Sequence, residues 1–242
     1  MSLIGRKKKN KTEEDKLAEL PLETLNELYL DKAIKAWDTA WNILHRDGWK
    51  HVTGQGSSEN GIVYNQHWPD TGRVFRLEGE VNGSPQMCFN ICVEEMPTCN
   101  QWNPTTIEGT VLQVVNENTD ISYNVTSEAA GGLVAKRDFV TTRHWKSKDG
   151  HIMSAGVAVH HPKAPPTKKY VRGENKAGGW VFRDVAGNPE KCTFIWIMNT
   201  QIKGWLPQSV VDATIPVFLL EFLGHLRNRV ELLKGNSRTN KQ

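Results

Sequence analysis

The chain begins with a clear helical pattern of apolar residues. These residues recur at helical spacing over residues 22–44, and Asp47-Gly48 ends the pattern. A second helical pattern, denser in apolar residues, covers residues 207–233. Pro216 interrupts it and Gly224 weakens it, so we expect this helix to bend or open more easily than an uninterrupted one.

Between the two helices, short alternating segments are separated by turns rich in Gly, Ser, Asn and Pro, which predicts strands. Most connections are too short for crossover helices, so the pairing should be antiparallel. Ser84-Pro85 is typical of a capped start of a short helix, and Pro97 should limit its extent. The expected strands lie around Val52 and at residues 62–64, 74–81, 110–115, 120–126, 139–145, 152–159, 170–182 and 192–199.

Two long helices that bracket a curved antiparallel sheet indicate an α+β fold of the helix-grip type. In that arrangement the concave sheet leaves a space that side chains alone do not fill. The 242 residues, 38% of them hydrophobic, suffice for one core. We therefore expect a single domain over residues 21–234, with a basic disordered tail at residues 1–20 and a disordered tail at 235–242.

Charge and cysteine content exclude several classes of function. The net charge of +3 is the small difference between 30 basic and 27 acidic residues, too weak to predict nucleic-acid binding. No apolar stretch precedes Leu20, so we expect neither signal peptide nor membrane span, and a cytoplasmic protein. The four cysteines lack paired CxxC spacing and lie in apolar or mixed segments, which predicts buried free thiols rather than a metal site. They are Cys88, Cys92, Cys99 and Cys192.

The sequence carries no pattern typical of catalysis. It lacks the GxSxG and HExxH motifs, a P-loop and a Gly-rich dinucleotide fingerprint. His160 and His161 are adjacent at a strand end, where neighbouring side chains point to opposite faces and do not easily share a metal. We therefore expect no enzyme activity and no cofactor.

Several short sequence motifs, in a fixed order, carry a family resemblance. They are Trp102-Asn103-Pro104, Ala129-Ala130-Gly131-Gly132, Arg137-Asp138-Phe139-Val140, Tyr170-Val171-Arg172-Gly173-Glu174-Asn175, Gly178-Gly179 and Lys203-Gly204-Trp205-Leu206-Pro207. Together they resemble a START lipid-transfer domain over residues 22–233. The likeness is greatest to the subgroup that contains steroidogenic acute regulatory protein and the late-endosomal cholesterol-binding members, and it extends to insect members that bind carotenoids.

The resemblance implies an internal tunnel, a flexible loop after the fifth strand and a C-terminal helix that acts as a lid. We call residues 127–136 the gate loop. Its small residues Ala129, Gly131 and Gly132 allow close approach and a mobile backbone, and Leu133 and Val134 offer apolar contact with the lid or a bilayer. A tight structural turn is the alternative interpretation.

In sterol-binding members of the family, an acidic residue on one strand and an arginine on the next form a pair near the polar end of the ligand. The matching positions here are Asn124 and Arg143, so an amide replaces the expected carboxylate. An unpaired buried cation is costly, so Arg143 should find water, a carbonyl, a ligand oxygen or another acid. Asp120 has the same strand parity as Asn124.

Further ligand contacts are expected from two strands and from the last helix. Ser154 and Asn199 are polar candidates on the strands. Phe218, Leu219 and Phe222 are apolar candidates on the helix, although each is also typical of plain core packing. On the strand at residues 192–199, alternate residues face opposite sides, and which face lines the tunnel stays open.

The function implied by the resemblance is non-enzymatic binding and transfer of one large hydrophobic lipid per domain. The ligand would be a sterol such as cholesterol or a carotenoid such as lutein. The gate loop or the last helix would open at a membrane, to which the protein binds transiently, and we expect a monomer. The alternative is a protein-interaction scaffold of the same fold that carries no ligand.

Overall fold

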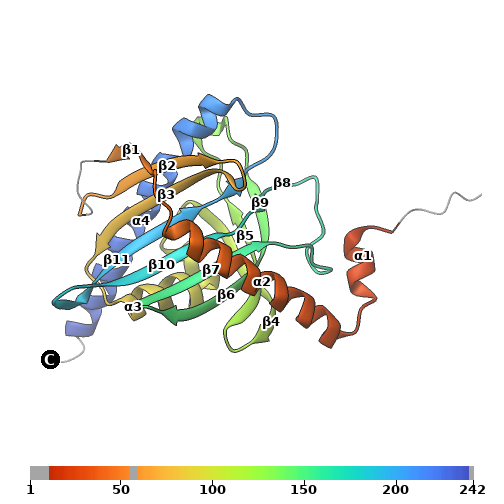
Figure 1. The fold of residues 1–242 in the computed structure, drawn as a ribbon, viewed down its shortest axis with the longest axis horizontal. Helices are drawn as coiled ribbons and strands as arrows, with labels where there is room; N and C mark the ends of the chain where they lie inside the picture. The colour runs from red at the N-terminus through yellow and green to blue at the C-terminus, as the bar shows by residue number, and fades with distance from the viewer. Residues whose placement is uncertain (1–10, 55–58, 240–242) are drawn as a thin grey trace, which may run out of the picture.

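The computed structural model describes residues 11–54 and 59–239. A large antiparallel sheet forms its centre, with the strand order β1-β2-β3-β11-β10-β7-β6-β5-β4. Helix α2 (Leu22–Leu44) crosses one face, and α3 (Pro85–Phe89) and α4 (Gln208–Thr239) pack on the other (Figure 1). This agrees with the α+β helix-grip arrangement that the sequence predicts.

The remaining elements are short helices and the strands themselves. A fourth α-helix, α1, covers Glu13–Ala18; η1 (Asn90–Glu94) is a π-helix, and η2 (Met96–Gln101) and η3 (Ala130–Gly132) are 3₁₀ helices. The strands are β1 (Lys50–Gly54), β2 (Ile62–Trp68), β3 (Gly72–Val81), β4 (Thr106–Asn116), β5 (Thr119–Thr126), β6 (Arg137–Lys148), β7 (His151–Ala158), β8 (Val171–Arg172), β9 (Glu174–Asn175), β10 (Gly178–Val185), β11 (Asn188–Met198) and β12 (Thr200–Gln201).

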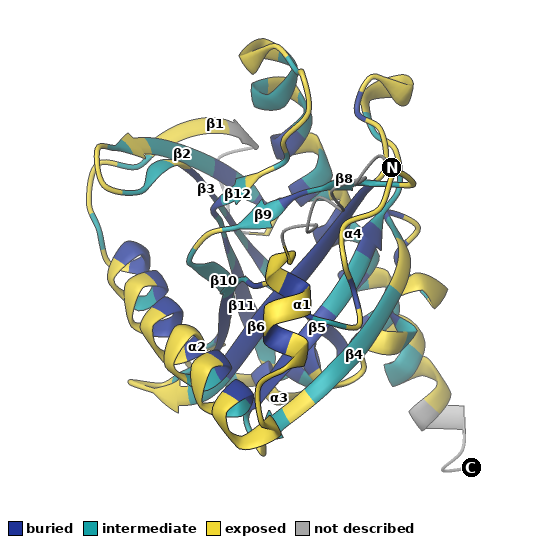
Figure 2. Ribbon diagram, turned by 90° about the vertical axis from the view of Figure 1, so that its right-hand side faces the viewer, coloured by how far each residue is buried: buried dark blue, intermediate teal, exposed yellow. Residues whose placement is uncertain are grey.

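Helix α2 is held by the apolar stripe that its sequence pattern predicts. Trp37, Ala40 and Ile43 are buried against the sheet, whose side chains on this face include Val181 and Ile195. The Trp37 indole Nε1 also donates a hydrogen bond to the Met153 carbonyl oxygen at 3.1 Å. Figure 2 shows the exposed stripe of α2 turned away from the buried strands. The period of 3.6 residues therefore places this helix correctly, from Leu22 to Leu44.

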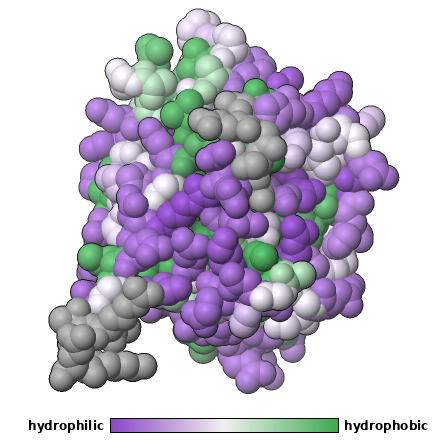
Figure 3. All heavy atoms as spheres, turned by 90° about the vertical axis from the view of Figure 1, so that its left-hand side faces the viewer, coloured by the Kyte–Doolittle hydropathy of each residue, from purple (hydrophilic) through white to green (hydrophobic). Residues whose placement is uncertain are grey.

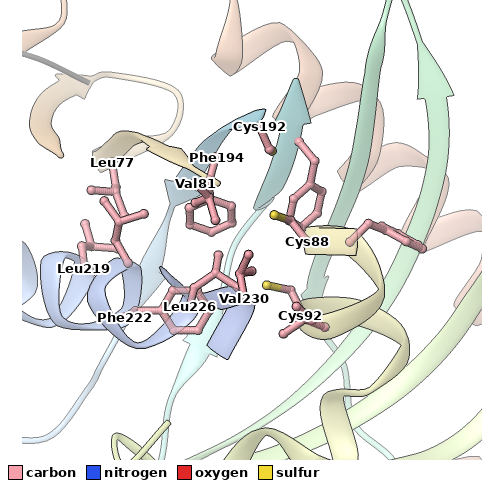
Figure 4. Close-up of a cluster of buried hydrophobic side chains, with 14 of the residues drawn as sticks. Leu77, Val81, Cys88, Cys92, Cys192, Phe194, Leu219, Phe222, Leu226 and Val230 are labelled. Carbon is pink, nitrogen blue, oxygen red and sulfur yellow. The ribbon is translucent and has the colours of Figure 1, made fainter. Parts of the chain in front are cut away.

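The second face of the sheet packs against α4 and α3. Leu219, Phe222, Leu226 and Val230 of α4 point toward the strands beside Leu77, Val81, Phe194 and the thiols of Cys88, Cys92 and Cys192 (Figure 4). All four cysteines are free and buried, as the sequence predicts. Burial raises the pKa of Cys92 and of Cys99, so these thiols are poor nucleophiles in the folded protein.

Helix α4 is also long and apolar. Among the described residues it alone is long and apolar enough to cross a membrane, over Gln208–Asn236. A core helix passes the same test, and here Leu219, Leu223 and Leu226 of this span are buried in the core.

The predicted N-terminal tail is wrong from residue 12 onward, because α1 is an ordered helix. Thr12 caps it, since its side chain accepts a hydrogen bond from the Asp15 N–H while Asp15 accepts one from the Thr12 N–H. Leu17 is buried in an apolar cluster with α2, and Glu14 Oε1 lies 2.7 Å from His160 Nδ1. The rest of that predicted tail, residues 1–10, lies outside the described residues.

Two other boundary predictions are wrong. The tail predicted at residues 235–242 is helical as far as Thr239, because α4 continues to that residue. The single strand predicted over residues 170–182 is divided into β8, β9 and β10. At Gly173 a Cβ atom would lie 2.2 Å from the Phe139 ring, so only glycine fits at this position. The strand is interrupted there.

Candidate functional site

A cavity of about 610 Å³ lies between the concave face of the sheet and α4. Its size falls within the range of small-molecule sites. Its exposed lining residues come mostly from the gate loop and from α4, with Lys176 between β9 and β10, so the mouth is bordered by these segments. They include Glu128, Ala130 and Gly131 on the gate loop and Ala213, Val217 and Glu221 on α4.

Aromatic rings form much of the apolar wall. The Phe222 ring centroid lies 4.9 Å from that of Trp196 and 5.7 Å from that of Trp180. Phe218 lies edge-on to Trp196 at 5.9 Å. These arrangements suit the quadrupoles of the rings and keep the wall rigid. The Trp180 indole Nε1 is buried without a hydrogen-bond partner among the described residues.

The strand face that meets α4 is the one that carries Phe194, Trp196 and Met198. Ile195 and Ile197, on the opposite face of β11, pack against α2. Ile197 nonetheless borders the cavity as well. This answers the question that strand alternation alone left open.

The acid that faces Arg143 is Asp120, which the sequence offers by strand parity; Asn124, at the position that matches the family's carboxylate, does not face it. β5 and β6 pair so that Asp120 lies opposite Arg143 and Asn124 lies opposite Phe139. Arg143 Nε donates to Asp120 Oδ1 at 2.8 Å and Nη2 donates to Oδ2 at 2.6 Å. Both residues are buried, so the pair is a desolvated, bidentate ion pair.

A third contact ties this pair to the π-helix. Arg143 Nη1 donates to the Val93 carbonyl oxygen at 3.3 Å, and Val93 lies in η1. The guanidinium is therefore satisfied by protein groups on all three nitrogens. Arg143 lines the cavity, but its charge is neutralised before any ligand arrives.

Two neutral polar side chains of the lining remain for a ligand, besides the charged lining residues Glu128, Arg137, Lys176 and Glu221. Asn124 and Ser154 line the cavity, and their side chains make no hydrogen bond to any described residue. Asn199 also lines it and donates to the Ala177 carbonyl oxygen at 3.4 Å. An amide and a hydroxyl of this kind can hydrogen-bond a hydroxyl or carbonyl group. Their contact with a ligand stays a prediction.

The other predicted site residues divide between wall, core and surface. Phe218 and Phe222 line the cavity, as do Ala129, Gly131 and Val134 of the gate loop. Leu219 is a correction, since it is fully buried in the core and does not line the cavity (Figure 4). Gly132 and Leu133 do not line the cavity either, and Leu133 is 69% exposed.

The gate loop is more ordered than a flexible connection. Ala129 and Val134 form an isolated β-bridge around the turn η3. Gly131 and Gly132 have φ of +63° and +91°, which favours glycine at both positions. Both interpretations from the sequence therefore describe part of it: the segment is a tight turn, and it borders the cavity mouth.

Sequence reasoning offered Asp120 to Arg143 through its strand parity, but it missed two residues of the site: Trp180 on the wall, and Arg137. A signal existed for Trp180, because it pairs with Trp196 across β10 and β11 and shares its face. Arg137 lines the cavity and is 4% exposed. In the described part of the chain, no group of three or more His, Cys, Asp or Glu residues could hold a metal ion.

Comparisons with known proteins agree with this geometry. A family model described as START domain matches residues 42–235. Steroidogenic acute regulatory protein of Homo sapiens is 34% identical over 204 residues, which cover 84% of this chain and 71% of that protein. The Danio rerio protein of the same name is 29% identical over 215 residues, which cover 88% and 75%.

Solved structures show the same fold. The structure of human StAR-related lipid transfer protein 5 superposes with a TM-score of 0.78 at 24% identity, covering 86% of this chain and 99% of that chain. Human STARD10 superposes with a TM-score of 0.67 at 18% identity, covering 93% and 84%.

Proposed function

The chain belongs to the START domain family, and from that premise we propose that its cavity binds one large hydrophobic lipid and transfers it between membranes without chemistry. The observation that carries the proposal is the cavity itself. It has an aromatic wall, and the buried Arg143–Asp120 ion pair beside it is already satisfied. The relatives that support it are named for steroidogenic regulation and for lipid transfer.

The polar lining favours a ligand whose polar end is uncharged. Arg143 is neutralised by Asp120, while Asn124 and Ser154 retain free hydrogen-bonding atoms. A phosphate headgroup beside these two residues would meet a guanidinium already paired with a carboxylate, whereas a hydroxyl would find donors and acceptors. We propose a sterol such as cholesterol, or a carotenoid such as lutein, as the ligand.

Lipid exchange requires contact with a membrane, and exposed apolar residues lie on the gate loop and on the connection between β12 and α4. Trp205, between β12 and α4, is 95% exposed, and Leu133 on the gate loop is 69% exposed. Hydrophobic atoms also gather at the end of the molecule where α4 begins, on a face that is otherwise largely hydrophilic (Figure 3). We propose that the protein acts as a cytoplasmic monomer that docks transiently through Trp205 and Leu133.

Replacing Trp205 with alanine should weaken binding to phosphatidylcholine vesicles by about tenfold, since burial of one large apolar side chain contributes roughly 1.5–3 kcal/mol. Leu133→Ala should weaken it in the same direction. Val114→Ala is a matched control, because Val114 is also 69% exposed but lies on the edge strand β4. Vesicle cosedimentation measures the effect, and equal losses for Leu133→Ala and Val114→Ala would contradict docking at the mouth.

The ligand itself is tested by extraction and loading. The purified protein is extracted with organic solvent, its visible spectrum is recorded and bound lipid is identified by mass spectrometry. Loading with cholesterol and with lutein is then measured separately. A carotenoid spectrum at near-equimolar loading identifies a pigment carrier, and sterol alone identifies a sterol carrier. Failure to bind either lipid would refute the proposal and favour a protein-interaction scaffold.

A further inference from the structure

One side of the cavity mouth is formed by a segment we call the strap, residues 202–215. It follows β12, which is held by pairing with β9, and it includes the first turns of α4. Ile202, Ala213, Thr214 and Ile215 of the strap line the cavity. Movement of the strap would therefore widen the mouth without any change in the sheet.

Arg137 joins the strap to the gate loop. Its Nε donates to the Ile202 carbonyl oxygen at 3.1 Å and its Nη2 donates to the Lys203 carbonyl oxygen at 3.2 Å. Its Nη1 donates to the carbonyl oxygen of Ala135, in the gate loop. One guanidinium therefore holds both sides of the mouth through backbone carbonyls.

The charge of Arg137 is not matched by an acid. No carboxylate of the described residues forms an ion pair with it, and the neighbouring Asp138 pairs with Arg172 at 2.8 Å. Burial lowers the pKa of Arg137, although arginine stays protonated in proteins. Because its partners are carbonyl dipoles, the contacts can break and hydrate without separating two opposite charges.

The other end of the strap meets a weak point in α4. Pro216 has no N–H, so the Asp212 carbonyl lacks its helical partner there. Beyond Pro216, Leu219, Leu223 and Leu226 are buried in the core and fix the rest of the helix. Before it, the strap is held by the partly exposed Arg73–Asp212 ion pair at 2.7 Å and by the packing of Ile215 and Val211 against the core.

We propose that Arg137 is the latch of the mouth and that the strap swings about Pro216 to open it, while the C-terminal part of α4 stays packed on the sheet. Arg137 is in this sense a positioning residue, since it acts through the two segments it joins. The inference rests on the proposed function for its purpose, but the coupling of strap and gate loop can be measured without any ligand.

The test compares Arg137→Lys, Pro216→Ala and the wild-type protein. Lysine keeps the charge but cannot reach three carbonyls at once. In Arg137→Lys, amide hydrogen exchange should rise together in the gate loop and the strap, and transfer of bound dehydroergosterol to phosphatidylcholine vesicles should accelerate about tenfold, as expected for loss of one charged hydrogen bond. Pro216→Ala restores a helical hydrogen bond and should slow transfer.

Arg172→Lys is the control, because Arg172 pairs with the residue next to Arg137 and its hydrogen bonds go to Asp138 and Ala164 rather than to the strap. It should leave exchange in the strap unchanged. The proposal would be refuted if Arg137→Lys raised hydrogen exchange in only one of the two segments, or throughout the sheet. It would also be refuted if Pro216→Ala transferred lipid as fast as the wild-type protein or faster. If the wild-type protein takes up no sterol, the sterol assignment fails, and hydrogen exchange in the two segments still decides whether Arg137 couples them.

Discussion

Asp120→Ala should lower the free energy of unfolding by about 3–5 kcal/mol, because it leaves the buried Arg143 guanidinium without its countercharge. Arg143 would keep only its bond to the Val93 carbonyl oxygen. For a chain of this size such a loss lowers the melting temperature by roughly 10 °C. Thermal and urea unfolding followed by circular dichroism measure it directly.

Two further variants show whether the charge pair is the cause. Asn124→Ala should change stability by less than about 1 kcal/mol, since the Asn124 side chain makes no hydrogen bond to a described residue. The double change Asp120→Leu with Arg143→Met removes both charges and should recover most of the loss. If Asn124→Ala were as destabilising as Asp120→Ala, the assignment of Asp120 as the partner would be wrong.

Strand parity offered Asp120 as a partner of Arg143, and the register of the hairpin settles the choice. The gate loop was predicted at residues 127–136, and counting outward in step along both strands from Ser127 and Lys136 reaches Asp120 and Arg143 together. The structure has this register. Hairpin register follows from the loop between two strands, and it outweighs a position carried over from other proteins. Asn124 matches the position in the family, but it lies opposite Phe139 in this chain.

A covalent bridge across the mouth should reduce lipid transfer to the background rate. Ala135 and Lys203 are suitable positions, since both are exposed and their carbonyl oxygens bind the same guanidinium. Cysteines placed at both positions and joined by a short bismaleimide would hold the gate loop to the strap. Because the four native thiols are buried, the reagent should react only at the new sites.

The controls separate the bridge from the substitutions. The same double variant capped with N-ethylmaleimide should transfer lipid at a rate close to that of the wild-type protein. The Lys203–Glu174 ion pair that it loses is exposed and contributes little to stability. An unchanged melting temperature excludes unfolding as the cause, and normal transfer by the bridged protein would refute gating at this mouth.

Helical periodicity predicted the two long helices, and the Ser84-Pro85 signal predicted the short helix α3, whereas α1 was not predicted. The spacing of apolar residues gave both ends of α2, because a long amphipathic helix needs only one partner face. Helix α1 is too short for its propensity to indicate it, and its order depends on Leu17 and Glu14 meeting α2 and His160. The only local signal was the capping pair Thr12 and Asp15.

Positions in the cavity were harder to predict than elements. Phe218 and Leu219 are adjacent and both apolar, yet one lines the cavity and the other is in the core. Periodicity distinguishes buried from exposed positions, but it does not distinguish residues packed in the core from residues that line a cavity. Arg137 was missed for a related reason, since its role depends on carbonyls of residues distant in the chain.

Phe222 belongs to the core cluster and to the cavity wall at once, with rings of Trp102, Trp180, Phe194 and Trp196 around it. A ligand in the cavity would therefore lie against a side chain that also belongs to the core. A molecule that fills the cavity binds the native chain and not the unfolded one, so at a hundred times its Kd it adds about 2.7 kcal/mol to the free energy of unfolding. The protein without a ligand should therefore have the lower free energy of unfolding.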